Sequence, residues 1–367
     1  MRIRSIALRL GLLVVVLTFL EIVARIAFAY LLPPQYTTVR GALAGENQFQ
    51  PGYQKTTESA YLLYTPTPGL AIEGIIDHNS HGYRGKAVSM DRTPGIYRIL
   101  CLGGSTTYGW GVTRAESAFP AQLEKLLNED PPAGYSSVEV INAGAPFATS
   151  AEAFLYYHFK FHYYKSDLVI LETGGNDAEG MLEPNYQPDY SNWRQAPAPI
   201  RPLAPFGRWL MHSRLIGLVV TPILYGQNPA KLTFIRDADI PPLSTWYPRS
   251  TDKRYYDKMP DIPVHENAFV HNTISLIRAV KQDGSRMLLF PFREGPRSRY
   301  SAAQEEAVEY NRKLLEKFAK EQSVAFAPFP QESVSRSNWV DSCHLNEAGC
   351  VEKARHLLPY VKSVIGQ

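Results

Sequence analysis

From Ile96 to the C-terminus, short apolar runs alternate with longer stretches that place apolar residues every three or four positions. The short runs are typical of buried β-strands, and the longer stretches are typical of amphipathic helices. Strands that alternate with helices build a parallel sheet, because each helix returns the chain to the starting edge. The sequence therefore predicts an α/β fold with a doubly wound, flavodoxin-like, five-stranded parallel sheet. The expected strands are Ile96–Leu102, Val138–Ile141, Leu168–Leu171, Met287–Phe290 and Val324–Phe326. The expected helices are Ala118–Asn128, Ser150–Tyr164, Ala268–Val280, Ala303–Ala319 and Glu347–Val364, the last capped by Asn346.

The N-terminus carries a second strong pattern. Leu10–Leu32 is apolar except for Glu21 and Arg25, and Pro33-Pro34 ends any helix there. Its 23 residues would form a helix of roughly 34 Å, enough to cross a hydrocarbon core of ~30 Å. Glu21 and Arg25 are four residues apart, so they face one another on a helix. The segment is therefore predicted to be a transmembrane helix.

The basic residues around this segment predict its orientation. Arg2, Arg4 and Arg9 precede the apolar run, and the next basic residue after Arg25 is Arg40. This asymmetry predicts a cytoplasmic N-terminus and an extracytoplasmic remainder, which is periplasmic in a bacterium. The alternative is a signal peptide that is cleaved near Ala29, followed by secretion. An uncleaved anchor is favoured, because charged residues lie between the apolar run and that site.

The rest of the chain divides by composition. Residues 181–265 contain 13 of the 28 prolines and three of the five tryptophans, Trp193, Trp209 and Trp246. This block interrupts the alternation, so it is predicted to be an insertion that caps the sheet edge or rests on the membrane. Its apolar stretch Leu215–Leu224 is too short to span a bilayer. The predicted parts are an anchor at 1–34, a lead-in at 35–95, a main domain at 96–180 with 266–367, and the insertion at 181–265.

Composition excludes several classes of protein. Hydrophobic residues make up 45% and charged residues 20%, which excludes a disordered chain. A net charge of +3 argues against a nucleic-acid partner. Three cysteines rule out a disulfide scaffold, although Cys343 and Cys350 can pair outside the cytoplasm. Cys101, within an apolar strand, is expected to be a buried, inert thiol.

Polar residues follow the predicted strands at their carboxyl ends, where open α/β sheets bind ligands. Ser105 follows the first strand and Asp341–His344 precedes the last helix. A serine hydroxyl needs an adjacent base to become a nucleophile. His344 can supply the base, and Asp341 can hold the imidazole in the required tautomer. The blocks at this edge are Gly103–Thr107, Asn142–Phe147, Gly174–Asp177 and Asp341–His344.

An oxyanion would also find hydrogen-bond donors here. The backbone N–H of Ser105, the Asn176 amide and a backbone N–H of the second block are the candidates. Asp177 is expected to make structural hydrogen bonds. His158 and His162 are four residues apart but lack an acidic partner at ligand spacing, so they are expected to pack or be solvated. No metal and no cofactor are predicted.

As a set, these blocks resemble the SGNH hydrolase (GDSL esterase/lipase) superfamily, over about residues 60–180 and 265–365. The run Asn79–Gly85 is also similar to the lead-in of membrane-anchored bacterial members. The resemblance implies catalysis by Ser105, His344 and Asp341, with an oxyanion hole from Ser105, Asn176 and a second-block residue. In two places the chain departs from the pattern. Gly104 stands where the signature has Asp, and the second-block glycine aligns with Phe147 rather than Gly144, so either could donate.

Three functions remain open. The first is a serine esterase or lipase that hydrolyses an ester-bearing small molecule, lipid or glycan on the extracytoplasmic side. The second is an O-acyltransferase that passes the acyl group to an exported polysaccharide, by analogy with other envelope proteins. The third is a binding or scaffold module with a defective site, which the departure at Phe147 would explain.

Overall fold

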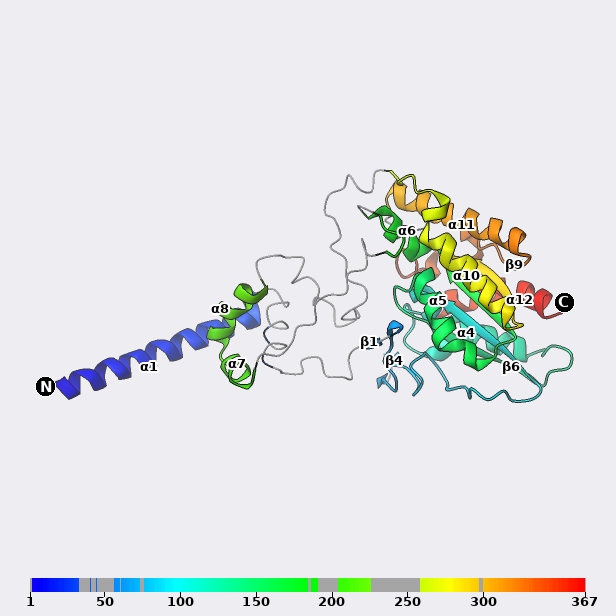
Figure 1. Cartoon of the computed structure of the whole chain (residues 1–367). Helices are drawn as coiled ribbons and strands as arrows, with labels where there is room; N and C mark the ends of the chain where they lie inside the picture. Colours follow the sequence, from blue (N-terminus) through cyan, green and yellow to red (C-terminus); the bar gives the residue numbers. More distant parts are fainter. Residues whose placement is uncertain are drawn as a thin grey trace. The chain divides into compact units, whose positions relative to one another are not determined.

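The computed structural model describes residues 2–32, 40, 44, 56–59, 61–72, 76–183, 186–190, 204–225, 258–296 and 300–366. The chain forms two compact units (Figure 1). One unit consists of Met1–Gln54 with Ala196–Trp246, and the other of Lys55–Gln195 with Tyr247–Gln367. Trp193, Trp246 and Pro33-Pro34 lie outside the described residues. The four-part division expected from composition stays a prediction.

The second unit is built on a five-stranded sheet in which every neighbouring pair of strands is parallel. The strand order is β6-β5-β7-β8-β9, so the chain starts near the middle, steps to one edge, and then crosses to the other. This order and the flanking helices confirm the predicted doubly wound α/β fold. The strands are β5 Ile96–Gly103, β6 Ser137–Gly144, β7 Leu168–Thr173, β8 Arg286–Pro291 and β9 Ala325–Phe326.

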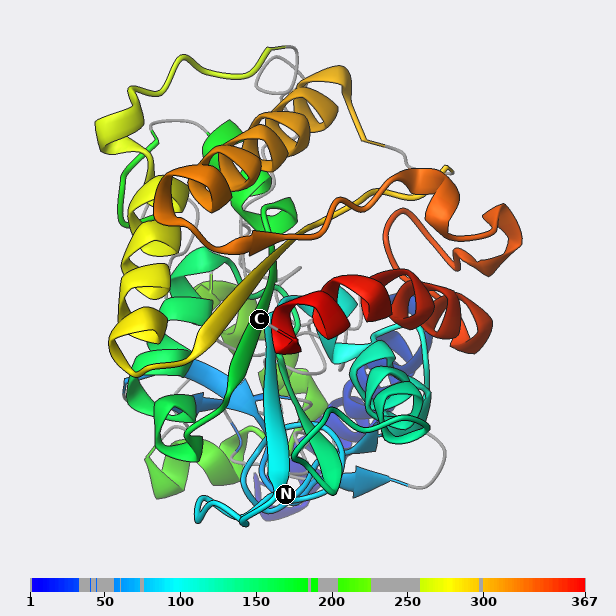
Figure 2. The ribbon, with the colours of Figure 1, turned by 90° about the vertical axis from the view of Figure 1, so that its right-hand side faces the viewer.

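Alternate residues of each strand are buried on opposite faces of the sheet, because successive side chains of a β-strand point to opposite sides. Along β5, Leu100 and Leu102 pack with helices α5, α10 and α11, whereas Ile99 and Cys101 pack with α4 and α12. Figure 2 shows α10 in yellow and α12 in red on the two sides of the sheet. The helices are α3 Ser105–Tyr108, α4 Phe119–Asn128, α5 Ser150–Phe159, α6 Gly175–Leu182, α10 Ala268–Gln282, α11 Ala302–Gln322 and α12 Glu347–Ile365.

Several element boundaries differ from the prediction, and the largest difference is at the end of α5. The helix expected over Ser150–Tyr164 ends at Phe159, because Lys160 leaves helical geometry (φ −135°, ψ −58°) and a 3₁₀ turn follows at Phe161–Tyr164. The strand expected to end at Ile141 continues to Gly144, in register with Gly103 of β5. The first residues of the second polar block therefore belong to a buried strand and not to a loop.

The lead-in folds as two short antiparallel hairpins before the sheet. At the other end of the unit, the side chain of Asn346 accepts a hydrogen bond from Gly349 N at 2.9 Å, which confirms the predicted cap of α12. The hairpin strands are β1 Thr56–Ser59, β2 Leu63–Pro66, β3 Ala71–Ile72 and β4 Ile76–Asp77.

The first unit contains helix α1, Arg2–Ile26, which continues as a π-helix over Ala27–Leu31. Within it, the 26 residues Ile6–Leu31 are long and apolar enough to cross a membrane. Glu21 and Arg25 form the expected ion pair, with Arg25 Nε 3.0 Å from Glu21 Oε1. The unit also contains the short helices α7, Pro205–Leu210, and α8, Arg214–Tyr225.

A buried ion pair ties the last helix to the middle of the sheet. Lys353 Nζ of α12 lies 2.6 Å from Glu172 Oε1 of β7, and both side chains are only 2% exposed. Thr107 of α3 donates its hydroxyl to the other carboxylate oxygen at 2.7 Å. The ammonium group also lies 4.3 Å from the centre of the Phe119 ring. The charges are therefore shielded from water and depend on one another.

Replacing Lys353 by Met tests this dependence. The substitution leaves the Glu172 carboxylate buried without its cation, so we expect the free energy of unfolding to fall by about 3–5 kcal/mol. Urea denaturation measures the loss. The double variant Lys353→Met/Glu172→Gln removes both charges and is expected to recover most of the lost stability. Equal losses in the single and double variants would contradict the account.

Candidate active site

Three side chains expected to act together form one chain of hydrogen bonds at the carboxyl edge of the sheet. His344 Nε2 lies 2.8 Å from Ser105 Oγ, and His344 Nδ1 lies 2.7 Å from Asp341 Oδ2. Ser105 is the first residue of α3, directly after β5, and the other two lie in the loop before α12. A hydroxyl, an imidazole and a carboxylate in this order can pass a proton from the hydroxyl to the ring.

Asp341 is held by its own loop. Besides the imidazole, it accepts hydrogen bonds from the backbone N–H groups of Cys343 at 2.9 Å and His344 at 2.8 Å. Partial burial raises the pKa of the Asp341 carboxyl, but the hydrogen bonds from the His344 ring and from these two N–H groups outweigh burial. The resulting pKa lies below the ordinary value for aspartate. The carboxylate therefore stays ionised and fixes the imidazole through Nδ1–H.

Glycines allow the elements around Ser105 to approach closely. A Cβ on Gly103 would lie 2.2 Å from Thr107 Oγ1, and one on Gly104 would lie 2.8 Å from Asn176 Nδ2. A side chain at either position would push away α3 or the Asn176 amide. The glycine found in place of the signature aspartate therefore lets Asn176 come close to the start of α3.

Arg84 braces the other end of α3, a role that the residue pattern did not suggest. Its buried guanidinium donates to three carbonyl oxygens at and after the last residue of α3. They belong to Tyr108 at 3.1 Å, Gly109 at 2.5 Å and Val112 at 2.8 Å. It also pairs with Asp77 at 3.1 Å. The only signal in the sequence was the lead-in run Asn79–Gly85, which contains Arg84.

The oxyanion candidates lie in different environments. Asn176, at the start of α6, uses Nδ2 to donate to Ala148 O at 2.8 Å, and its amide has a second N–H. Gly144 is the last residue of β6, and its N–H donates to Asn142 Oδ1 at 3.1 Å. A Cβ there would lie 2.2 Å from Tyr108 N. Gly144 therefore serves close packing between β6 and α3, and its N–H is already engaged within the strand.

Phe147 has a left-handed backbone, with φ of 62°. This conformation costs a residue with a Cβ roughly 1–2 kcal/mol relative to the right-handed region. The position that aligns with a glycine in the resembling family thus keeps a glycine-like backbone, although a phenylalanine occupies it. The backbone at this position is therefore strained, because phenylalanine adopts a conformation there that glycine adopts without strain.

Asp177 ties the second and third blocks together. It accepts hydrogen bonds from Ser150 N, Ser150 Oγ, Thr173 Oγ1 and Tyr190 OH. Burial raises the pKa of its carboxyl above the ordinary value. Its contacts are structural, as the sequence predicted.

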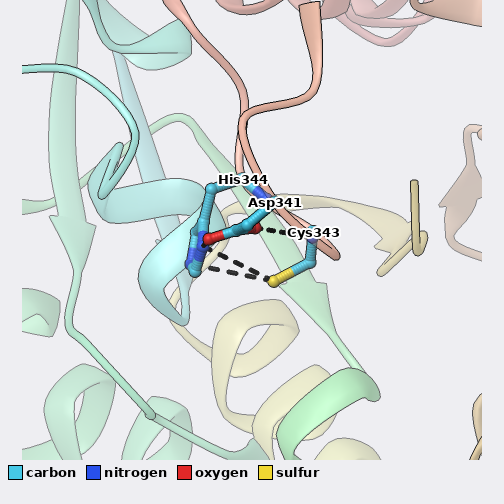
Figure 3. A group of neighbouring side chains, drawn as sticks. All are labelled: Asp341, Cys343 and His344. Atoms are coloured by element: carbon cyan, nitrogen blue, oxygen red, sulfur yellow. Dashed lines mark hydrogen bonds and ion pairs between the residues drawn. The ribbon is translucent and has the colours of Figure 1, made fainter. Parts of the chain in front are cut away.

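Cys343 packs against the candidate base. Its Sγ lies 3.7 and 3.8 Å from the two ring nitrogens of His344 (Figure 3). Side-chain atoms of Asp341, Cys343 and His344 that can bind metals lie within 4.8 Å of one another. Both imidazole nitrogens already take part in the hydrogen-bond chain, so a metal ion would compete with it. Burial raises the pKa of the Cys343 thiol, which also disfavours the thiolate. The absence of a metal and of a cofactor stays a prediction.

Cys343 and Cys350, whose pairing the sequence left open, are both free thiols in the structure. Cys343 is half-buried beside Tyr300, whereas Cys350 is on α12 and faces the core beneath the sheet. Cys101 is buried, as predicted.

The two histidines of α5 and the following turn do not come together as ligands. His158 stacks on Phe154 with ring centres 5.7 Å apart, and His162 Nδ1 lies 3.2 Å from Asp283 Oδ2. Sequence spacing missed the acidic partner of His162, which lies 121 positions away along the chain. This contact lies at the surface.

Two cavities among the described residues lie away from Ser105, Asp341 and His344. One of about 680 Å³ is lined by Asp77, Arg84 and Glu124 among others, between the lead-in and α4. Another of about 580 Å³ is lined by Asp167 and Arg286, at the amino ends of the strands. Neither contains Ser105, Asp341 or His344, so neither is assigned to the site.

Comparison with known proteins gives a family and a set of solved structures. The model of the GDSL-like Lipase/Acylhydrolase family matches residues 101–350. The crystal structure of TesA is 17% identical, covering 73% of this chain and 99% of that chain, with a TM-score of 0.42. A catalytic mutant of Axe2, an acetylxylan esterase from Geobacillus stearothermophilus, is 14% identical, with coverages of 72% and 94% and a TM-score of 0.43. The lipase/acylhydrolase from Enterococcus faecalis is 12% identical, with coverages of 73% and 96% and a TM-score of 0.42. A search of curated proteins gave no match.

The strain at Phe147 can be measured with two matched variants. Phe147→Ala and Phe147→Gly remove the same ring, but only glycine tolerates positive φ. We expect Phe147→Gly to be more stable than Phe147→Ala by about 1–2 kcal/mol in urea denaturation. At the helical position Ala151, Ala151→Gly is expected to lose about 1 kcal/mol, the opposite sign. If alanine is the more stable residue at both positions, the backbone at Phe147 is not strained.

Proposed function

The chain belongs to the GDSL-like lipase/acylhydrolase family, and from this premise we propose that Ser105, His344 and Asp341 form the catalytic triad of a membrane-anchored ester hydrolase. That the chain is an ester hydrolase follows from the family itself. The assignment of roles rests on one observation, the hydrogen-bond chain from Ser105 Oγ through His344 to Asp341. Its substrate is an ester-bearing molecule.

The proposed reaction has two halves. His344 Nε2 takes the proton of Ser105 as Oγ attacks the ester carbonyl, and Asp341 stabilises the imidazolium through Nδ1–H. His344 then gives that proton to the leaving alcohol, which departs and leaves an acyl group on Ser105. In the second half, His344 takes a proton from water, the hydroxide attacks the acyl carbonyl, and the proton returns to Ser105 Oγ as the acid is released.

The negative charge that develops on the carbonyl oxygen needs donors. We assign them to the backbone N–H of Ser105, the free hydrogen of the Asn176 amide and the backbone N–H of Phe147. Gly144 is left out, because its N–H is bonded to Asn142 within β6. One such donor is typically worth about 2.7–4 kcal/mol in the transition state.

The anchor in this proposal is helix α1. Arg2, Arg4 and Arg9 precede the apolar run that begins at Leu10, which favours a cytoplasmic N-terminus and a hydrolase unit on the extracytoplasmic side. We also propose that α1 is retained in the mature protein and is not cleaved near Ala29.

The role of Ser105 is tested with a fluorophosphonate probe, which reacts with activated serines. We expect the wild-type protein to be labelled and Ser105→Ala to lose both labelling and about 10⁶-fold in kcat on a short-chain nitrophenyl ester. Ser342→Ala serves as the control, since this half-buried serine lies on the loop of Asp341 and His344 but outside the hydrogen-bond chain. Labelling that survives in Ser105→Ala refutes the assignment.

The pH dependence follows from the charge states of the other two residues. The Asp341 pKa is lowered, so this carboxylate stays ionised as the pH falls, and only protonation of His344 removes the base. We expect kcat/KM to fall on the acid side with a slope of about 1 in a logarithmic plot. Asp341→Asn is expected to lower kcat by about 10⁴, because the imidazole adopts the wrong tautomer. An acid limb with a slope of about 2 would show that a second group titrates.

A further inference from the structure

Helix α1 carries a carboxylate within the stretch that is long enough to cross a membrane. Glu21 lies ten residues before Leu31, the last residue of that stretch. This places it roughly 15 Å from the outer end of the span at ~1.5 Å per residue. A charged side chain at such a depth is costly unless other groups hydrogen-bond it. The partners of Glu21 therefore indicate what else lies at that depth.

Those partners come mainly from the start of α8, almost 200 positions later in the chain. The Ser213 hydroxyl donates to Glu21 Oε2 at 2.7 Å. The backbone N–H groups of Arg214 and Leu215 donate to the two carboxylate oxygens, each at 3.0 Å. These N–H groups have no partner within their own helix, and the positive end of the helix dipole favours a carboxylate there. Glu21 thus caps α8, and Arg25 completes its set of partners.

Helix α8 then runs along α1 toward its outer end. Gly217, one turn after Ser213, is buried, and a Cβ there would lie 3.6 Å from the Phe28 ring and 2.8 Å from the Arg40 side chain. Thr221, one turn further, is also fully buried. Small residues at this spacing allow close packing of the kind found between helices in membranes.

The opposite face of α8 and the neighbouring helix α7 are apolar and exposed. Val219 is 55% and Ile223 72% exposed on α8, and Phe206 is 70% and Trp209 66% exposed on α7. The rings of Phe206 and Trp209 stack with centres 6.0 Å apart. We call these four residues the apolar face of the α7–α8 hairpin. Large apolar side chains that are exposed on two successive short helices mark a surface that another apolar phase covers.

We propose that the α7–α8 hairpin inserts into the outer leaflet of the membrane beside α1, with lipid acyl chains covering its apolar face. The proposal rests on the proposed anchor. Two observations carry it: the bonds to Glu21 fix the start of α8 at a depth inside the span, and the large apolar side chains of α7 and α8 are exposed, as are those of α1. The 12 residues of α8 measure about 18 Å, so the helix enters the membrane without crossing it.

The same contacts bear on whether α1 is removed. Cleavage near Ala29 would take away Glu21 and Phe28, and with them the cap and the packing partner of α8. The hairpin therefore requires an uncleaved α1.

Quenching by brominated lipids tests the insertion on the full chain in phosphatidylcholine/phosphatidylglycerol vesicles. Two variants each add one tryptophan at an exposed position, Ile223→Trp on the apolar face and Tyr163→Trp on the hydrolase unit. Bromine quenches only fluorophores that lie in the acyl-chain region. We expect the added fluorescence of Ile223→Trp to be quenched at least about twofold more than that of Tyr163→Trp. Trp209→Phe is expected to remove a quenched component from the wild-type emission.

The link to Glu21 is tested in the same vesicles. Glu21→Leu removes the cap, so quenching at Ile223→Trp is expected to fall toward the value for Tyr163→Trp, while Glu21→Gln keeps an acceptor and retains more of it. An N-terminal epitope tag separates the two ways to fail. Loss of the tag shows that α1 is cleaved, which overturns the anchor and the hairpin together. A retained tag with equal quenching at Ile223→Trp and Tyr163→Trp overturns the hairpin and leaves the anchor standing.

Discussion

The ion pair between Glu172 and Lys353 is the contact on which the geometry of the site depends. Glu172 lies near the carboxyl end of the central strand β7, and Lys353 projects from α12. Both are withdrawn from water, where an unpaired charge is strongly unfavourable, so they can be accommodated only together. The hydroxyl of Thr107 adds α3 to the same network. One buried interaction thus fixes the helix that begins with Ser105 and the helix that follows His344 relative to one strand.

Close packing restricts the other walls of the site. Gly103, Gly104 and Gly144 each lie where a Cβ would meet a neighbouring atom at less than 3 Å, and all three contacts involve α3 or Asn176. Arg84 holds the carbonyl groups at the far end of α3. Helix α3, which begins with Ser105, is therefore held at both ends. Phe147, in the turn after β6, has a left-handed backbone, which is strained for a residue with a Cβ.

The strands and helices around the sheet could be predicted from the sequence. Each strand is a short apolar run and each helix has apolar residues every three or four positions, and both patterns are local. That Ser105, Asp341 and His344 lie together could be predicted, because Ser105 follows a strand and the other two precede a helix, so the topology brings them to one edge of the sheet. Contacts between distant segments could not be read. Arg84 gave no local sign of its three carbonyl partners, and Asn142 looked like a loop residue although β6 continues through it. Whether Cys343 and Cys350 pair could not be predicted either. Nearness in sequence does not say which hydrophobic cluster a residue joins, and the two cysteines join different ones.

Glu21 shows most clearly what local reasoning misses. Its spacing from Arg25 places the two side chains on one face of a helix, where they form an ion pair. Yet a single exposed partner satisfies only part of a carboxylate, which can accept several hydrogen bonds. The remaining bonds come from the first turn of α8, within the block that composition had marked as unusual. Under the proposal that α1 is retained, these bonds give the Glu21 carboxylate hydrogen-bond donors within the apolar span and hold α8 beside α1. Within the described part of the proline- and aromatic-rich block, the first turn of α8 is thus held beside α1 by the carboxylate of Glu21.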